Sequence, residues 1–350
     1  MADIRPLVRY GKPSADLIAI KQSFFRENAQ HLAHSRELGA IYRRQPARTK
    51  CKCCDGALDG VGFTKQDIDY VLCGRCGHLN GRHEDTAEFC RTVYTADDGK
   101  DYAANYAAED REAFDRRIEV IYLPKARFLI DGLRNAGATP EALSFADIGA
   151  GSGYFVGAMR RAGLGRAVGY EVSAAQCALA GAMVGDGSVQ RLELDGEAAL
   201  VRQLDTAVVS LIGVLEHVRN PRALLAAIHD NPKIRYLFLS VPLFSPSVYF
   251  EMVFPGAMQR QLSGGHTHLY TESSLDWTCR EYGFGRVAEW WFGTDLVDLY
   301  RSVLVNLEGD PALRAMAGPW SQSWAGAIDE MQLALDKRKL SSEVHLLLSV

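Results

Sequence analysis

One short segment of this 350-residue chain combines a carboxylate with three closely spaced glycines: Asp147-Ile-Gly-Ala-Gly-Ser-Gly153. It follows the apolar run 143–146 and precedes residues 154–161, whose composition predicts a helix. The segment therefore predicts a buried strand that ends in a carboxylate, then a tight turn, then a helix. Because glycine has no side chain, such a turn brings the backbone close to a ligand and is typical of nucleotide-binding sites.

The charge and spacing of this segment favour one class of nucleotide. The glycines stand at 149, 151 and 153, whereas the dinucleotide-binding fingerprint needs a glycine at 154, where the chain has Tyr154. Asp147 would repel the pyrophosphate of a dinucleotide, but it would attract the sulfonium and ammonium groups of S-adenosylmethionine (SAM). Glu171 ends the next expected strand, about 20 residues beyond the glycines, where an acid can bind both ribose hydroxyls. The alternative is a glycine turn that binds no ligand.

A second group of residues has the spacing of metal ligands. Two Cys-x2-Cys pairs, separated by eighteen residues, predict a structural zinc site with four thiolate ligands: Cys51, Cys54, Cys73 and Cys76. Four protein ligands leave no open position, so the metal would stabilise a region that has few apolar side chains. Two disulfide bonds or an iron site are the alternatives, and Cys53, His78 and His83 are substitute ligands.

Alternating strand and helix patterns follow these motifs and predict an α/β fold. Strands are expected at 143–148, 166–171, 188–193, 205–211, 234–241, 285–291 and 343–349. The alternation predicts a doubly wound, mostly parallel, seven-stranded Rossmann-like sheet with helices on both faces. The run 205–212 is apolar almost throughout, as expected for a central strand that is buried on both faces.

Three regions are expected along the chain. Residues 1–50 are predicted to form a helical arm, with one helix over 14–44, and residues 51–99 a zinc-binding module. Residues 100–350 form the sheet domain, which begins with a helix over 100–137 that Pro124 kinks or splits. The domain also contains a helical insertion at about 295–338. There, Trp320 and Trp324 share one helix face, which favours core packing or a homodimer contact.

Three histidines lie where an acceptor is expected. Ligands of a doubly wound sheet bind at the carboxyl ends of the strands, and the segments 210–218, 241–246 and 264–268 all reach this edge. Methyl transfer from a sulfonium needs alignment, exclusion of water and removal of one proton. An imidazole suits that last step, and the candidates are His217, His266 and His268, with His266 favoured. Alternatively, His217 braces its loop, and His266 holds a substrate hydroxyl within a cover formed by 242–268.

The charge distribution bears on the partners. The net charge is −4, but residues 1–52 contain eleven Lys and Arg against four Asp and Glu. This basic arm favours an anionic small-molecule acceptor, with a solvated helix surface as the alternative. Met1 to Lys12 has no apolar core of a signal peptide, and no apolar run reaches the ~18 residues of a membrane span. The sequence therefore predicts a cytoplasmic protein without membrane contact.

Taken together, these motifs resemble those of the class I SAM-dependent methyltransferases. The resemblance rests on Asp147 to Gly153, on Glu171, and on Val214-Leu-Glu-His-Val218 with Asn220-Pro221, and it covers about residues 100–350. Within that family, the motifs look like those of bacterial small-molecule and ubiquinone-type methyltransferases. The resemblance implies a seven-stranded sheet whose last strand is antiparallel, and the final run 344–350 fits that strand.

The resemblance also implies a set of cofactor-binding residues: Asp147, Gly149, Gly151, Gly153, Tyr154, Glu171, Val172, Asp195, Ile212 and Gly213. Asp147 and the glycines would hold the methionine part, Glu171 the ribose, and Asp195 the adenine amino group. The ubiquinone-type enzymes have a glutamate in the place of Gly213 that helps to hold a divalent ion, so no catalytic metal is predicted. The N-terminal zinc module is similar to that of sugar C-methyltransferases.

The sequence thus predicts a SAM-dependent methyltransferase that acts at oxygen on a sugar, a polysaccharide precursor or a secondary metabolite. Its acceptor would be anionic or nucleotide-linked. One alternative is an RNA methyltransferase that binds nucleic acid through the zinc module and the basic arm, which the acidic net charge disfavours. The other is a protein that keeps the cofactor fold without activity, which the intact Asp147 and Glu171 disfavour.

Overall fold

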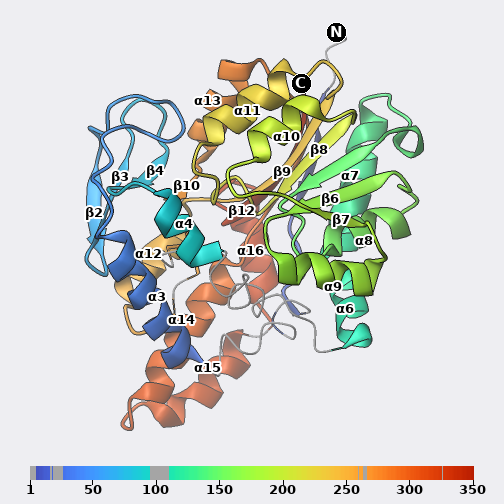
Figure 1. Cartoon of the computed structure of the whole chain (residues 1–350). Coiled ribbons are helices and arrows are strands. Elements are labelled where there is room, and N and C mark those ends of the chain that lie inside the picture. The colour runs from blue at the N-terminus through green and yellow to red at the C-terminus, as the bar shows by residue number, and fades with distance from the viewer. Residues whose placement is uncertain are drawn as a thin grey trace.

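The computed structural model describes residues 5–15, 18, 27–94, 110–258, 260–262, 266–324 and 326–350. Within these ranges the chain forms one large sheet covered by helices and a smaller antiparallel sheet beside it (Figure 1). In the part of the chain that the structure describes, every helix is too short or too polar to span a bilayer.

The large sheet contains eight strands in the described residues, in the spatial order β1-β11-β12-β9-β8-β5-β6-β7. They are β1 (Leu7–Tyr10), β5 (Phe145–Ile148), β6 (Ala167–Glu171), β7 (Val189–Arg191), β8 (Val208–Ile212), β9 (Tyr236–Pro242), β11 (Gly285–Phe292) and β12 (Glu343–Ser349). All neighbours are parallel except β12, which is antiparallel to β9 and β11. The predicted doubly wound α/β fold and the antiparallel last strand are confirmed.

The strand count differs from the prediction of seven because of β1. This strand pairs in parallel with β11, from Leu7 opposite Ala288 to Tyr10 opposite Trp291. Residues 1–50 are therefore not only a helical arm, since they also supply an edge strand. A four-residue strand is too short for a clear alternating pattern, and only the free edge of β11 gives it hydrogen-bond partners.

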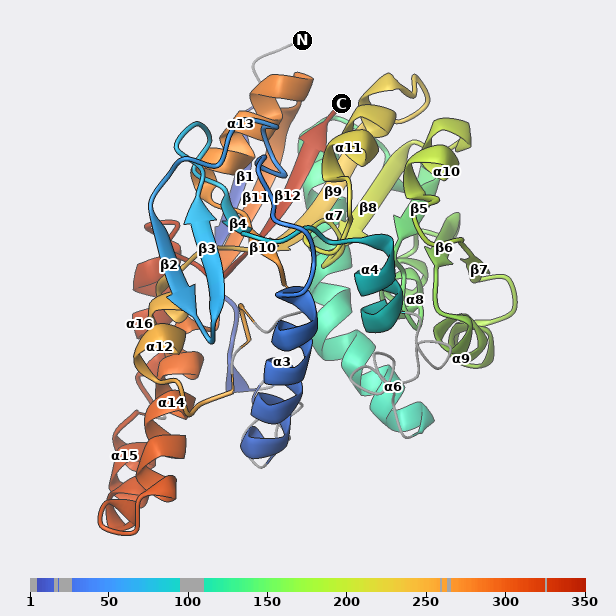
Figure 2. The same ribbon diagram turned by 60° about the vertical axis from the view of Figure 1, so that its left-hand side comes forward.

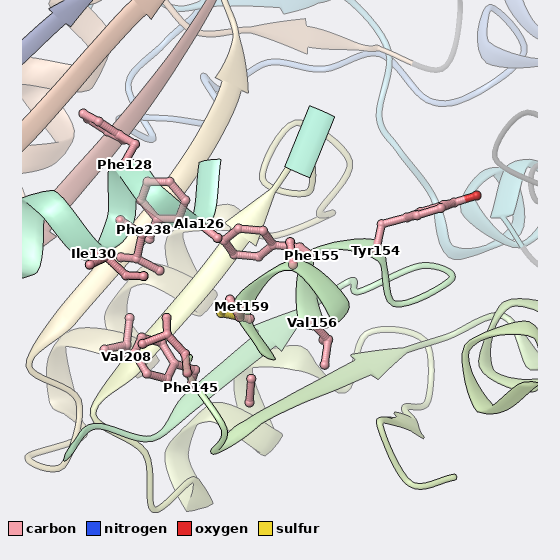
Figure 3. Packing of buried hydrophobic residues seen from close by; sticks show 14 of the residues in the cluster. Ala126, Phe128, Ile130, Phe145, Tyr154, Phe155, Val156, Met159, Val208 and Phe238 are labelled. Atoms are coloured by element: carbon pink, nitrogen blue, oxygen red, sulfur yellow. The ribbon is translucent and has the colours of Figure 1, made fainter. Parts of the chain in front are cut away.

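Helices cover both faces of the large sheet. One layer contains α7 (Leu123–Asn135), α8 (Tyr154–Arg161) and α9 (Ala174–Val184), and the other contains α10 (Glu197–Gln203), α11 (Pro221–Asp230) and α13 (Glu272–Tyr282). Adjacent strand residues point to opposite layers. Phe238 packs with Phe128 and Phe155 in the first layer, whereas Leu237 packs in the second (Figure 3). Because helices bury both faces of the sheet, the positions of the strand ends next to the site are fixed.

A close contact at Gly132 provides a test of this packing. A side-chain carbon at this position of α7 would lie 2.8 Å from Leu347 Cδ2 and 2.9 Å from Ala288 Cβ. We expect Gly132→Val to lower the free energy of unfolding by about 1–3 kcal/mol, because it overpacks the contact between helix and sheet. Gly181→Val in α9 is the matched control, since the nearest atom there is 3.6 Å away. Equal losses for the two variants in urea unfolding would contradict this explanation.

The predicted helix over 100–137 is present in its described part, and it is interrupted near Pro124. α6 (Arg111–Arg117) continues through a π-helical turn (Ile118–Tyr122) into α7, whose first turn contains Pro124. A short 3-10 turn (Pro140–Ala142) then leads to β5. The N-terminal helix α3 spans Asn28–Tyr42. Residues 100–109 and most of 14–27 lie outside the described residues.

The smaller sheet joins the cysteine-containing region to the large sheet domain. Its antiparallel strands are β10 (His268–Leu269), β4 (Leu79–Gly81), β3 (Ile68–Leu72) and β2 (Gly62–Lys65). β10 belongs to the segment 242–268 that was expected to cover the site, and this segment also contains α12 (Pro246–Val253). α4 (Ala87–Tyr94) follows the small sheet and lies toward the edge of the large one (Figure 2).

The predicted helical insertion lies between β11 and β12 and extends away from the sheet (Figures 1 and 2). It consists of α14 (Asp295–Gly309), a 3-10 turn (Arg314–Met316), α15 (Ala317–Trp324) and α16 (Ile328–Asp336). The rings of Trp320 and Trp324 lie 4.5 Å apart, and the indole of Trp320 donates to Tyr300 O at 3.1 Å. These tryptophans therefore pack within the insertion itself.

Candidate active site

The glycine-rich turn between β5 and α8 has the backbone conformation that the sequence predicted. Gly149, Gly151 and Gly153 have φ angles of 68°, 54° and 78°, which side chains strongly disfavour. A side-chain carbon on Gly149 would also lie 2.6 Å from Val214 Cγ2, in the loop after β8. The turn therefore lets two loops from neighbouring strands approach each other at the carboxyl edge of the sheet.

A cavity of about 310 Å³ lies at this edge. Its lining includes all but one of the predicted cofactor-binding residues: Asp147, Gly149, Gly151, Tyr154, Glu171, Val172, Asp195, Ile212 and Gly213. Gly153 is the exception, because it begins α8 and faces Ala180. Residues from four separate loops thus converge on one volume, as expected for a ligand site at the end of a parallel sheet.

Asp147 is a buried carboxyl group at the base of this cavity. It is 2% exposed and accepts a hydrogen bond of 2.6 Å from Ser210 Oγ. Burial raises the pKa of Asp147 to about 7, and the negative charge of Glu171 adds to this rise against the hydrogen bond from Ser210. A cationic ligand beside Asp147 would therefore favour the ionised form of this carboxyl group.

Glu171 is held rigidly at the end of β6. Its two carboxylate oxygens accept hydrogen bonds from the backbone N–H of Gly151, at 2.9 Å, and of Ser173, at 2.8 Å. Each oxygen keeps a second lone pair, so the carboxylate can also accept from the two hydroxyls of a ribose. The bond from Gly151 N–H holds the Glu171 carboxylate in a fixed position relative to the glycine turn.

Two further predicted cofactor residues, Tyr154 and Asp195, also line the cavity. Tyr154 is stacked between Phe114 and Tyr122, with ring centroids 4.3 and 5.3 Å away. Asp195 accepts a hydrogen bond of 2.5 Å from Arg219. The Asp195 carboxylate is 41% exposed, so this ion pair is partly open to solvent and to a ligand.

The three candidate histidines occupy different environments. His217 lines the cavity, and the ring of His266 lies 4.9 Å from its ring. His266 Nδ1 donates to Gln261 O at 2.9 Å, and burial lowers the pKa of His266, so its Nε2 offers a lone pair. His268 belongs to β10, is fully buried and bonds to His78 at 2.8 Å. This placement does not favour His268 as a base.

Glu216 completes a polar group with the first two histidines. One ligand atom from each of Glu216, His217 and His266 can be chosen so that all lie within 4.8 Å of one another. Glu216 is 3% exposed, and burial raises its pKa to about 8. Three such groups can share a proton, and their ligand atoms are also of the kind that binds divalent cations.

Comparison with known proteins identifies the sheet domain. A family model described as a methyltransferase domain matches residues 121–289, which include the glycine turn, Glu171 and His217. Together with the glycine turn and the two acids of the cavity, this match indicates a SAM-dependent methyltransferase. The chain is accordingly an enzyme of this class, and the resemblance of residues 147–153 and 214–218 to such enzymes is supported. None of the curated proteins matches the sequence of this methyltransferase.

Solved methyltransferases are distantly similar in structure. Magnesium protoporphyrin IX methyltransferase from Synechocystis PCC 6803, with bound S-adenosylhomocysteine (SAH), has 13% identity and a TM-score of 0.45 over 75% of this chain and 99% of its own. The plantazolicin methyltransferase BpumL with SAH has 14% identity and a TM-score of 0.43, with coverages of 74% and 93%. A SAM-dependent methyltransferase from Archaeoglobus fulgidus has 14% identity and a TM-score of 0.38, with coverages of 64% and 94%.

The cavity of the methyltransferase is also lined by a second set of polar residues that sequence reasoning missed. Its polar lining includes Lys12, Lys125, Ser240, Arg260, Thr294 and Glu343. Lys125 lies 3.7 Å from Glu343, which also accepts from Ser240 Oγ at 3.0 Å. Lys12 follows β1, and its ammonium group lies 5.3 Å from the centroid of the Phe292 ring. Burial and the nearby Lys125 lower the pKa of Lys12 to about 8.

The four predicted zinc ligands are brought together in the cysteine module. The sulfurs of Cys51 and Cys76, and those of Cys54 and Cys73, lie 3.6 Å apart, and all four lie within 4.8 Å of one another. A tetrahedron with metal–sulfur bonds of about 2.3 Å has edges of about 3.8 Å, so the cluster could hold zinc. All eight cysteines are free, and the thiol of Cys53 faces Ser274 and Thr278 instead.

Proposed function

We propose that this enzyme transfers the methyl group of SAM to an oxygen of a small anionic molecule, such as a sugar, a polysaccharide precursor or a secondary metabolite. One observation carries the proposal. A single cavity is lined by the predicted cofactor residues, by His217 and by further polar residues that include the buried cation Lys12. The resemblance of the cysteine module to that of sugar C-methyltransferases supports a sugar-type, nucleotide-linked acceptor.

The proposed roles of the cofactor residues follow from their chemistry. Asp147 would face the cationic methionine part, and the carboxylate of Glu171 would accept from the ribose hydroxyls. Asp195 would accept from the adenine amino group, and Ile212 and Gly213 would contact the cofactor through their backbone. When bound, SAM supplies an electrophilic methyl group on sulfur. The protein has to align the acceptor oxygen and exclude water around it.

We assign proton removal from the acceptor hydroxyl to an imidazole nitrogen of His217. Of the three candidate histidines, it is the one that lines the cavity. His266 lies behind it and can take part through a shared proton, although the sequence favoured His266 itself. A neutral imidazole is required, and Glu216, with one carboxyl oxygen 4.0 Å from His217 Nε2, lies close enough to share the proton once it is taken.

RNA is the less favourable acceptor. Several cations of the arm and the cysteine module are buried in ion pairs rather than exposed for phosphates. Arg48 and Lys52 pair with Asp85, and Lys65 pairs with Glu251, with exposures of the three cationic side chains of 6%, 2% and 4%. A nucleic-acid surface needs such charges at the surface.

The His217→Ala variant tests the proposed function. We expect it to lower turnover by about 10²- to 10⁴-fold, because the acceptor loses its general base. SAH affinity should stay within about twofold of the wild type. The measurement is SAH formation from SAM with acceptors from a panel of nucleotide sugars, sugar phosphates and hydroxylated acids.

His229→Ala, on the exposed face of α11, is the control for this test. A His217→Ala variant that retains more than a tenth of the wild-type turnover would exclude His217 as the base. Methylation of RNA, with no product from the whole panel, would refute the proposed acceptor class.

A further inference from the structure

We propose that Lys52 is a positioning residue that ties the cysteine module to the loop carrying His217, so that metal binding by the module orders the methyl-transfer site. The edge loop is defined as residues 213–219, and the ligand turn as residues 51–54. This inference rests on the proposed function, since it assigns the edge loop to the cofactor and acceptor site. Zinc would then do more than stabilise a separate unit.

Three hydrogen bonds join the module to the edge loop and to the start of α11. Lys52 Nζ donates to Val218 O at 3.0 Å, next to His217. Arg219 Nε donates to Asp85 O at 3.0 Å, and Arg222 Nη1 donates to Cys53 O at 2.9 Å. The two segments are more than 120 residues apart in the chain, and side chains of each donate to backbone carbonyls of the other.

The central contact is buried. Lys52 and Asp85 form an ion pair whose side chains are 2% and 5% exposed, and Arg48 also bonds to Asp85. A buried ammonium group is very unfavourable unless all its donors have partners. The carbonyl of Val218 supplies one of those partners, so the position of the edge loop is strongly constrained by Lys52.

The ligand turn is itself fixed by the sulfur cluster. The backbone N–H of Lys52 donates to Asn80 Oδ1 at 2.9 Å, and Asn80 Nδ2 donates to Cys51 Sγ at 3.4 Å. A metal held by Cys51 and Cys54, two of the four ligands, would immobilise the turn on both sides of Lys52. Loss of the metal would therefore release the donor that holds Val218 O.

The module is also braced against α13, which makes it a fixed support for the edge loop. His78 contacts Ser274 Oγ at 3.3 Å, and Trp277 packs against the cysteine cluster. The guanidinium groups of Arg75 and Arg222 lie 5.9 and 5.4 Å from the ring of Trp277. The cysteine module thus contacts α13 through Trp277 and, through Arg222, the helix α11 that follows the edge loop.

The test compares Lys52→Met with Lys50→Met in the full-length, zinc-loaded protein. Methionine keeps the length of the side chain and removes the charge and donors. Lys50 is two residues away but pairs with Asp55 at the surface, where its side chain is 64% exposed, so it is the matched control. We measure zinc content, hydrogen–deuterium exchange of peptides covering 213–219, the NMR resonances of the His217 ring, and SAH binding.

We expect Lys52→Met to retain its zinc, to exchange on the order of tenfold faster in the edge loop, and to shift the His217 resonances while those of His34 stay unchanged. Lys50→Met should behave as the wild type. Unchanged edge-loop exchange in Lys52→Met, or a rise spread evenly over the whole chain, would overturn the proposal. Wild-type protein that fails to bind SAH would instead reject the proposed function, because the exchange data do not depend on the ligand.

If Lys52→Met does not fold, the Arg222→Met variant tests the same coupling between the module and the edge loop. It removes the bond to Cys53 O from a side chain that is 32% exposed, so folding is less at risk. We expect the same local rise in exchange at 213–219, with zinc retained. Exchange that remains at the wild-type rate in Arg222→Met would then count against the coupling.

Discussion

Replacing Asp147 with asparagine should lower the affinity for SAM by about 100-fold or more while leaving the fold intact. The carboxyl group is buried, lines the cavity and directly precedes the glycine turn in the chain. Removing one partner of a buried charge pair costs about 3–5 kcal/mol, because the other charge is left without compensation. Asparagine keeps the shape and can still accept from Ser210 Oγ. Calorimetric titration with SAM and SAH measures the change.

The same residue predicts the direction of a pH effect. The pKa of Asp147 is raised to about 7 without a ligand, and a cationic ligand favours the ionised form. Below pH 7, binding must therefore expel a proton, and SAM affinity should rise with pH, up to tenfold per pH unit, and level off above about pH 8. The groups that face Asp147 are Ser210, Glu171 and Lys125.

Two variants separate Asp147 from those neighbours. In Asp147→Asn the pH slope should vanish. In Ser210→Ala, which removes a donor to the ionised carboxylate, the midpoint should move to higher pH. A slope that persists in Asp147→Asn would assign the titration to another acid of the cavity. Tight binding of NADH without any binding of SAH would refute the assignment of this cavity to SAM.

The residues of the glycine turn and the acid before it could be predicted because the pattern that indicates them lies within one short segment of the sequence. Strand, carboxylate, glycine turn and helix follow one another within 143–161, and the left-handed backbone at Gly149 requires the residue type that stands there. The four cysteines were predictable for the same reason, since each pair lies on one turn.

The second set of polar lining residues could not be predicted because it is assembled from distant segments. Lys12 reaches the cavity only because β1 pairs with β11, with Leu7 opposite Ala288 at the far end of the chain. The sequence favoured His266 as the base, whereas the structure favours His217, and this difference also arises from contacts between distant segments. Residues 266–268 were expected to meet the acceptor, but β10 pairs with β4 and draws His268 into the small sheet. Long-range strand pairing leaves little signal in a two-residue strand.

Removing one zinc ligand is the second change with a large expected effect. We expect Cys51→Ser to reduce the zinc content from one equivalent to near zero and to lower Tm by several degrees or more. The apolar side chains of the cluster are few, with Leu58 and Val71 as the buried aliphatic members and Trp277 packed against it. Structural zinc contributes on the order of 10 kcal/mol to the folding of such small units, and this core cannot replace that amount.

Cys53→Ser is the matched control, because it changes a cysteine on the same turn whose thiol faces Thr278 Oγ1 at 3.5 Å. It should keep one equivalent of zinc and a Tm close to that of the wild type. Zinc is measured by mass spectrometry on protein purified without added metal, and Tm by calorimetry. Loss of zinc from Cys53→Ser but not from Cys51→Ser would mean that Cys53 is a ligand and that the turn is arranged differently. Iron in place of zinc would keep the four ligands and change only the metal, because both ions accept four thiolates in a tetrahedron.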